Sequence, residues 1–225
     1  MLKLYHVTPR ATHPGSHNAL KVLIALSELN APCEVIDMDP DRDLRPLDVP
    51  YRKLNPNGLT PTLDDDGYIL WESSAIMQYL CATRGPTPLL PTDAKARGLV
   101  QQWLAWEGST FTPGLMALFM AKMSGQTAEA ELAKVAGLLG ILDKQLSSQL
   151  SGQLGGQLTG HDFLTGNYSL ADIALGCNVA ALALLGMNLQ AYPATQAWLD
   201  RLATRPAWQQ EIFLNDYRAL QGKAA

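Results

Sequence analysis

The hydrophobic pattern at the start of the chain changes its period several times. Residues 2–7 alternate apolar and polar positions, which predicts a strand, and apolar residues at helical spacing over 19–29 predict a helix. Residues 33–38 predict a second strand, so this strand–helix–strand order indicates a right-handed parallel βαβ unit. The charged, Pro-rich stretch 39–50 then predicts a loop, ending in a short helix near 51–54.

Two more short strands are predicted at 61–63 and 68–71. The DDDG run at 64–67 between them is typical of a hairpin turn, and a helix follows over 72–83. The first 84 residues are therefore predicted to form an α/β domain with the order βαβ-ββα.

The pattern changes at residues 85–91, where a Gly-Pro-Thr-Pro run marks a linker. No strand is predicted after it, so residues 92–225 are interpreted as an all-helical domain. Its first helix begins at Thr92 or Asp93, with Pro113 as a kink. A Gly-rich connection is expected over 152–166. The predicted helices are 92–123, 127–149, 169–185, 195–204 and 207–217.

Composition narrows the function classes. The chain of 225 residues is 47% hydrophobic but only 17% charged, against a typical charged fraction of about 25%. A net charge of −4 without a basic stripe makes nucleic acid an unexpected partner. The absence of a signal-type apolar stretch or an 18-residue apolar run predicts a cytoplasmic protein that does not span a membrane.

The chain has three cysteines and no C-x-x-C motif, which indicates neither a disulfide framework nor a zinc site. We expect no metal and a reducing compartment. Cysteines without such a motif are mostly buried, so all three are expected in the core: Cys33, Cys81 and Cys177.

The stretch NPNGLTPTL, residues 55–63, combines turn signals with a proline at a strand entry. A cis Thr60-Pro61 bond would expose the backbone N–H and C=O of Thr60 to an extended peptide ligand. The stretch taken alone favours the commoner trans turn.

Two predicted helix starts can hold an anion. At WESSAI, residues 71–76, the helix amides and Ser73 suit a carboxylate, and Glu72 suits an ammonium group. At PGSHNALKV, residues 14–22, Ser16 and Asn18 lie where a thiolate would be stabilised. In both stretches the alternative is a plain helix N-cap with no ligand.

These three stretches, in this order and followed by a helical half, resemble the glutathione transferase superfamily. The resemblance covers nearly the whole chain and extends to NYSLADIAL at 167–175 and to 192–210. It implies a thioredoxin-like N-terminal domain, glutathione as co-substrate without another cofactor, a role in detoxification and a homodimer. It also implies that Thr60-Pro61 is cis, that the Thr60 backbone pairs with the cysteinyl part of glutathione, and that Glu72 and Ser73 hold its γ-glutamyl end.

The residue that activates the thiol is a choice between two positions. Ser16 fits the place of the serine in serine-type classes. Residues 16–22 also look like a variant of the Thr-Pro-Asn-Gly-x-Lys-Val run of the Nu and prion-related group, where the Asn position, here Asn18, faces the sulfur and disulfide reduction is often favoured. The run departs at His17 and Ala19, which leaves the subclass open, and Tyr5 ranks low because it lies within the strand.

The other contacts implied by the resemblance are less direct. Leu59 replaces a polar residue that many members have before the cis-proline pair, so one glutathione contact is missing. Arg52 or Lys53 is the candidate for the glycyl carboxylate, and His13 and His17 lie close to the site.

Six residues are candidates to line the apolar second-substrate pocket, although their helical spacing alone indicates core. Trp106 and Phe111 are preferred among the six, which are Trp103, Trp106, Phe111, Met116, Phe119 and Met120.

Ser169 and Asp172 form an S-x-x-D capping box and are interpreted as folding residues. The resulting hypothesis is a glutathione transferase with Ser16 and Asn18 at the sulfur, and Lys53, Leu59, Thr60, Pro61, Glu72 and Ser73 at glutathione. Peroxidase activity is compatible with it. Disulfide reductase or isomerase activity on the same fold, and a non-catalytic binding protein, are the alternatives.

Overall fold

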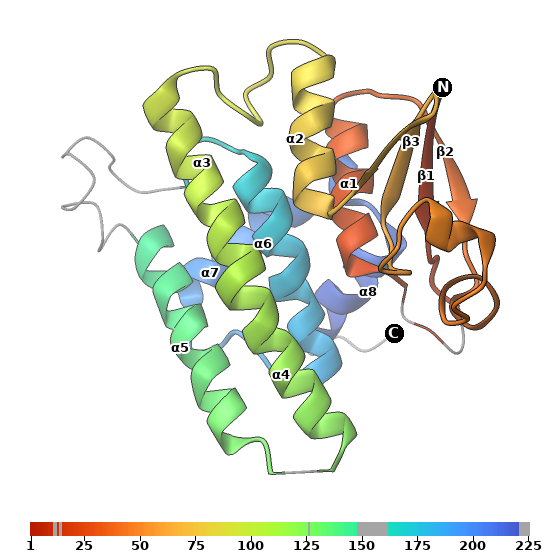
Figure 1. The fold of residues 1–225 in the computed structure, drawn as a ribbon. Coiled ribbons are helices and arrows are strands. Elements are labelled where there is room, and N and C mark those ends of the chain that lie inside the picture. The colour runs from red at the N-terminus through yellow and green to blue at the C-terminus, as the bar shows by residue number, and fades with distance from the viewer. Residues whose placement is uncertain (11–12, 14, 126, 148–161, 221–225) are drawn as a thin grey trace. The chain divides into compact units, whose positions relative to one another are not determined.

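The computed structural model describes residues 1–10, 13, 15–125, 127–147 and 162–220 (Figure 1). The chain divides into two compact units, Met1–Thr87 with Gln210–Ile212, and Pro88–Gln209 with the chain from Phe213 onward. Residues 152–161 of the predicted Gly-rich connection lie outside the residues that the structure describes. Among the described residues, every helix is too short or too polar to serve as a membrane span.

The first unit is built on a four-stranded sheet with the order β2-β1-β3-β4. β1 pairs with β2 in parallel and with β3 antiparallel, and β3 pairs antiparallel with β4. Helix α1 connects β1 to β2, and α2 follows β4 and packs on α1 (Figure 1). This is the predicted thioredoxin-like βαβ-ββα order. The bounds are β1 (Leu2–His6), α1 (His17–Glu28), β2 (Cys33–Asp37), β3 (Thr62–Asp65), β4 (Tyr68–Trp71) and α2 (Ser73–Thr83).

The segment between β2 and β3 contains more helix than the sequence predicted. A π-helical turn, η1 (Pro40–Leu44), precedes the 3-10 turn η2 (Pro50–Lys53). Leu44 and Tyr51 from these turns are buried against Val7 and Met38 in a small core cluster. The helical turns therefore arise from apolar residues that the charged composition of the segment obscured.

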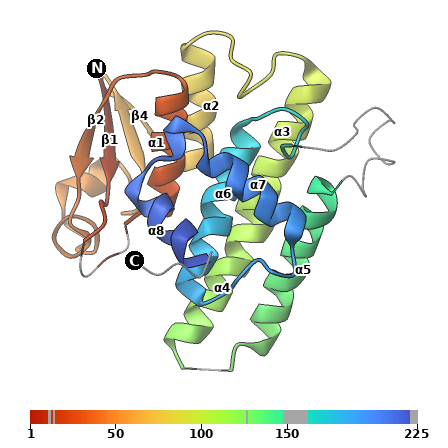
Figure 2. The ribbon, with the colours of Figure 1, turned by 180° about the vertical axis from the view of Figure 1, so that it is seen from behind.

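The second unit is helical throughout its described residues. α3 and α7 pack against α6, and α4 and α7 pack against α5 (Figure 2). Every residue of α6 is buried, which is expected of a helix that is apolar on all sides. The bounds are α3 (Ala94–Trp106), η3 (Glu107–Phe111), α4 (Thr112–Met123), α5 (Glu129–Leu146), α6 (Leu170–Ala180), η4 (Ala181–Leu185), α7 (Pro193–Ala203), η5 (Pro206–Trp208) and α8 (Glu211–Leu220).

The predicted long helix over 92–123 is present as α3, η3 and α4. Asp93 caps it, since its side chain accepts the Ala96 N–H at 2.9 Å. The predicted irregularity at Pro113 lies just before that residue, in the π-helical turn η3. Proline has no N–H group to donate to a carbonyl of the preceding turn, as an α-helix would require. The carbonyls of that turn must therefore accept hydrogen bonds from other groups. The buried Glu107 carboxylate of this turn accepts the Asn178 amide at 2.6 Å from α6.

Candidate functional site

Ser16 lies where β1 leads into α1. Its backbone N–H donates to the Val7 carbonyl at 3.0 Å, and its Oγ accepts the Ala19 N–H at 3.2 Å. Ser16 is therefore the N-cap of α1. The same hydroxyl also donates to the Thr60 carbonyl at 3.4 Å. Two stretches that the sequence singled out, 44 residues apart, thus meet at one point.

The Thr60-Pro61 peptide bond is cis, which confirms the implication of the resemblance over the trans turn favoured by the stretch alone. Thr60 is half-buried and Pro61 is buried, whereas the Leu59 side chain is 65% exposed. Leu59 itself therefore offers solvent-facing apolar surface, and the backbone of Thr60 is the polar feature of this loop.

A hydrogen-bond network that the sequence analysis missed holds this loop. The Leu59 carbonyl accepts the Tyr51 hydroxyl at 2.7 Å and the Asn55 amide at 2.8 Å. Tyr51 and Asn55 also bond the Thr62 hydroxyl, at 2.6 and 3.2 Å. Burial raises the pKa of Tyr51, so its hydroxyl stays a donor. The Asn-Pro-Asn-Gly turn signal could have identified Asn55, because an Asx turn requires its side chain, but nothing in the pattern pointed to Tyr51.

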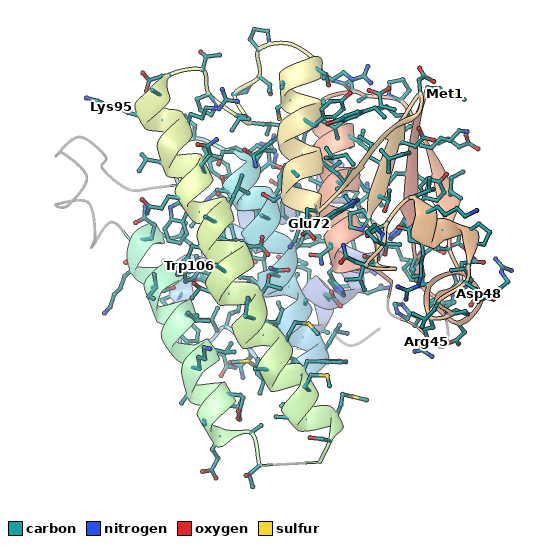
Figure 3. The ribbon with its side chains drawn as sticks, viewed as in Figure 1. Met1, Arg45, Asp48, Glu72, Lys95 and Trp106 are labelled. Atoms are coloured by element: carbon teal, nitrogen blue, oxygen red, sulfur yellow. The ribbon has the colours of Figure 1, made fainter. Side chains whose placement is uncertain are left out.

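Glu72 lies at the junction of β4 and α2 (Figure 3). Its φ of +74° is in a region that favours glycine, so a glutamate there is strained. The predicted helix consequently begins at Ser73, one residue later than expected. Strained backbone of this kind concentrates at ligand sites, because the surroundings must impose it. The Ser73 side chain is buried beside the amides that begin α2.

The two basic candidates on η2 have different environments. The Arg52 guanidinium donates to the carbonyls of Pro46, Leu44 and Pro56 at 2.9, 3.0 and 3.1 Å. It therefore holds the loop together. Lys53 is exposed, so of the two it is the basic group turned to solvent.

His13 and Cys33 both have a pKa that is shifted by their surroundings. His13 Nδ1 accepts the Gly15 N–H at 3.0 Å, and burial, together with the Arg10 charge, lowers the pKa of His13. The expectation that Cys33 is a core residue is wrong, because it is half-buried at the start of the edge strand β2. Burial raises the Cys33 pKa to about 11. Cys81 and Cys177 are buried, as predicted.

The apolar residues of the long helix divide into two groups. Phe111 is 1% exposed and packs on Trp106 at a ring distance of 5.6 Å, whereas Trp106 keeps partly exposed surface. The core interpretation holds for Trp103 and Phe111 but is wrong for three residues of α4. Met116, Phe119 and Met120 are 48%, 36% and 61% exposed. The assignment of Trp106 and Phe111 to a second-substrate pocket stays a prediction.

The capping box at α6 is confirmed, with Ser169 bonding the first turn and Asp172 bonding the Ser169 N–H at 2.9 Å. Asp172 is fully buried and also accepts the Trp198 indole N–H at 2.9 Å. Burial raises the pKa of Asp172 to about 6. Within the described ranges, no group of three or more His, Cys, Asp or Glu side chains is arranged to hold a metal ion.

A thioredoxin-like sheet with a cis-proline loop at the start of its first helix, joined to a helical unit, defines a class of proteins that includes the glutathione transferases. The sequence matches the family models of the glutathione S-transferase N-terminal domain over residues 12–88 and C-terminal domain over 109–206. The chain belongs to the glutathione S-transferase superfamily, and its relatives support glutathione-dependent transferase activity in general.

Named relatives agree with this assignment. Glutathione S-transferase GstB of Escherichia coli is 28% identical over 209 residues, covering 89% of this chain and 95% of its own. Glutathione S-transferase F10 of Arabidopsis thaliana is 30% identical over 176 residues, covering 71% and 76%. The delta-class glutathione transferase of Nilaparvata lugens superposes with a TM-score of 0.82 at 25% identity, covering 99% and 98%.

Proposed function

We propose that this protein activates the thiol of glutathione for attack on an apolar electrophile. The observation that carries the proposal is the 3.4 Å contact between the Ser16 hydroxyl and the Thr60 carbonyl. It joins the N-terminus of a helix, which favours a thiolate, to a loop whose backbone suits a peptide ligand. Both halves of a glutathione site are thus adjacent in one compact unit.

Glutathione binds in three places in this proposal. Its cysteinyl backbone pairs with Thr60 beside Pro61, and its γ-glutamyl end lies at Glu72 and Ser73. The α2 amides suit the γ-glutamyl carboxylate, and the exposed Glu72 carboxylate suits the ammonium group. Lys53 is the candidate partner of the glycyl carboxylate because it is the exposed base of η2.

The reaction needs a stabilised thiolate. The Ser16 hydroxyl makes only a long bond to Thr60, so it can turn to donate to the sulfur, and Asn18 is exposed on the first turn of α1. The thiol proton leaves to solvent. The sulfur lone pair then forms a bond to an electrophilic carbon, and the leaving group departs with its bonding electrons.

The helical unit carries the residues that we assign to the second substrate and to the contact between two copies of the chain. Trp106 offers partly exposed aromatic surface, which suits an apolar electrophile. The exposed face of α4 carries Met116, Met120 and Met123, which lie at helical spacing. We assign it to the contact between two copies of a cytoplasmic homodimer, which sedimentation of the purified protein tests.

Removal of the Ser16 hydroxyl tests the proposed thiol activation. In Ser16→Ala and Asn18→Ala, we expect kcat/KM for conjugation to a chlorodinitrobenzene to fall about tenfold, or about 1.4 kcal/mol. Ser16→Thr keeps both the hydroxyl and the cap and is expected to keep activity. Since Ser16→Ala also removes an N-cap, unfolding is measured on every variant.

The outcomes separate the alternatives. A loss below about threefold in both alanine variants overturns the activation site. Glutathione binding with reduction of small disulfides, but without conjugation, favours the reductase. Failure to bind immobilised glutathione favours a non-catalytic binding protein.

The Tyr51 network yields a separate prediction for glutathione binding. Tyr51→Phe keeps the ring but removes one of two donors to the Leu59 carbonyl. The loop before Thr60 loosens, so we expect KM for glutathione to rise about three- to fivefold with kcat nearly unchanged. Steady-state kinetics with saturating electrophile measures this. Tyr5→Phe is the matched control, because it removes a phenol hydroxyl from a neighbouring ring, 5.5 Å from that of Tyr51, and leaves both donors to the Leu59 carbonyl in place. Equal effects of the two variants would contradict the role of the hydroxyl.

A further inference from the structure

Lys21 is an unusual residue for the interior of the first unit. Its side chain is only 1% exposed, and it is among the largest fully buried side chains of the protein. Burying an ammonium group is strongly unfavourable unless polar groups receive its hydrogen bonds. The buried ammonium group therefore needs polar partners close to it.

The ammonium group of Lys21 reaches back to the start of its own helix. Side chains in α-helices point toward the N-terminus, so residue 21 meets residue 18. The Lys21 Nζ donates to Asn18 Oδ1 at 2.9 Å. The positive charge thus lies at the helix end where the dipole is already positive, which is the less favourable end for a lysine. The first turn of α1 carries no acidic residue.

This contact determines which way the Asn18 amide is turned. An ammonium group can only donate, so the amide oxygen must face Lys21. The NH₂ group of Asn18, which carries two donors, then faces away from the lysine. Asn18 is exposed, so these donors are available to a ligand at the end of α1.

We infer that Lys21 is a positioning residue that holds the Asn18 amide with its NH₂ group toward the glutathione sulfur. This inference rests on the proposed function. The ammonium group also polarises the amide through its oxygen, which strengthens the N–H donors. The thiolate is then stabilised by the Asn18 amide, the Ser16 hydroxyl and the end of α1, while the lysine itself stays beneath the surface.

The test compares the ionisation of bound glutathione in wild type and four variants. Lys21→Met keeps the length and apolar character of the side chain but leaves the Asn18 amide free to rotate. We expect the pKa of the bound thiol, followed by thiolate absorbance, to rise by about one unit. Below that pKa, kcat/KM falls about tenfold, and the loss disappears at high pH. Binding of S-methylglutathione, which has no ionisable thiol, is expected to change less than about twofold.

The remaining variants distinguish positioning from stability. In an Asn18→Ala background, Lys21→Met is expected to add less than about twofold, because its effect acts through the amide. Asn18→Asp leaves Lys21 an oxygen acceptor but has no NH₂ group, so the pKa of the bound thiol is also expected to rise in this variant. This variant tests the amide even if Lys21→Met does not fold.

Three results would overturn the inference. They are an unchanged thiol pKa in Lys21→Met, an equal loss of activity at every pH, and a low thiol pKa in Asn18→Asp. The proposed function fails differently, since wild-type protein would then bind no glutathione or show no thiolate. A pH-dependent loss in Ser16→Ala with an unchanged profile in Lys21→Met would remove this inference alone.

Discussion

Replacing Asp172 by alanine is expected to lower the free energy of unfolding by about 3–5 kcal/mol. The fully buried carboxylate accepts four hydrogen bonds, from the N–H groups of Leu164 and Ser169, the Ser169 hydroxyl and the Trp198 indole, all between 2.9 and 3.1 Å. Removing it leaves three buried N–H donors without an acceptor, and each costs about 1–3 kcal/mol. Urea unfolding followed by circular dichroism measures the change.

Ser169→Ala is the matched control, because it removes the cap but leaves the carboxylate. It is expected to cost about 1 kcal/mol and to leave KM for glutathione unchanged. A similar small cost in Asp172→Ala would contradict the central role of the carboxylate. A large loss of glutathione affinity in Asp172→Ala, with unchanged unfolding, would instead move Asp172 from folding to function.

The elements that the sequence predicted well are those with a simple period. Alternation over 2–7 sufficed for β1, because one face of that strand is buried. Helical spacing over 19–29 sufficed for α1, although the structure buries almost every residue from 19 to 26. The turn before β4 was also readable, since Asp66 and Gly67 both adopt positive φ in a two-residue hairpin loop. The DDDG run supplies Asp and Gly, the residue types that tolerate the positive φ of this turn.

The site was only partly readable from the chain. Ser16 and Thr60 could be singled out by helix-start and turn signals, but their contact is tertiary and has no local signature. The strain at Glu72 was invisible, because a glutamate carries no signal for positive φ. The sequence analysis assigned Lys21 no role, and only the three-dimensional structure shows it buried against Asn18.

Exposed apolar residues were the other source of error. The spacing of Met116 and Met120 is that of a core face, although both side chains are exposed. Apolar side chains are buried for the same physical reason whether the covering surface belongs to the same chain, to a second copy or to a ligand. A helix face that is apolar for a second copy of the chain or for a substrate therefore has the pattern of a core face. Sequence periodicity alone cannot tell these cases apart, because it reports that a face is apolar and not what covers it.

His6 is expected to make the protein lose stability in mild acid. It ends β1, is 2% exposed, and its Nδ1 makes no hydrogen bond among the described residues. Burial lowers the pKa of His6 from 6.5 to about 4, although the nearby Asp37 charge opposes the shift. The folded state therefore holds the histidine neutral over a range where the unfolded chain takes up a proton.

The sign and the size of the effect follow from this difference in pKa. Stability is complete above pH 6.5 and is lost as the pH falls toward 4, because only the unfolded state gains the proton. The loss reaches about 2 kcal/mol at pH 5 and about 3 kcal/mol below pH 4. Asp172 acts in the opposite direction, since its raised pKa of about 6 lets the folded state take up a proton first.

A comparison of wild type with His6→Leu isolates the histidine from the other titrating groups. Leucine keeps an apolar side chain at the buried position and cannot be protonated. Urea unfolding at pH 7.5 and pH 5 is expected to show wild type losing about 2 kcal/mol more than the variant between the two conditions. Parallel losses in the two proteins would mean that His6 is solvated or protonated in the folded state, and acid unfolding would then have to originate in the carboxylates, such as Asp37, whose pKa is lowered in the fold.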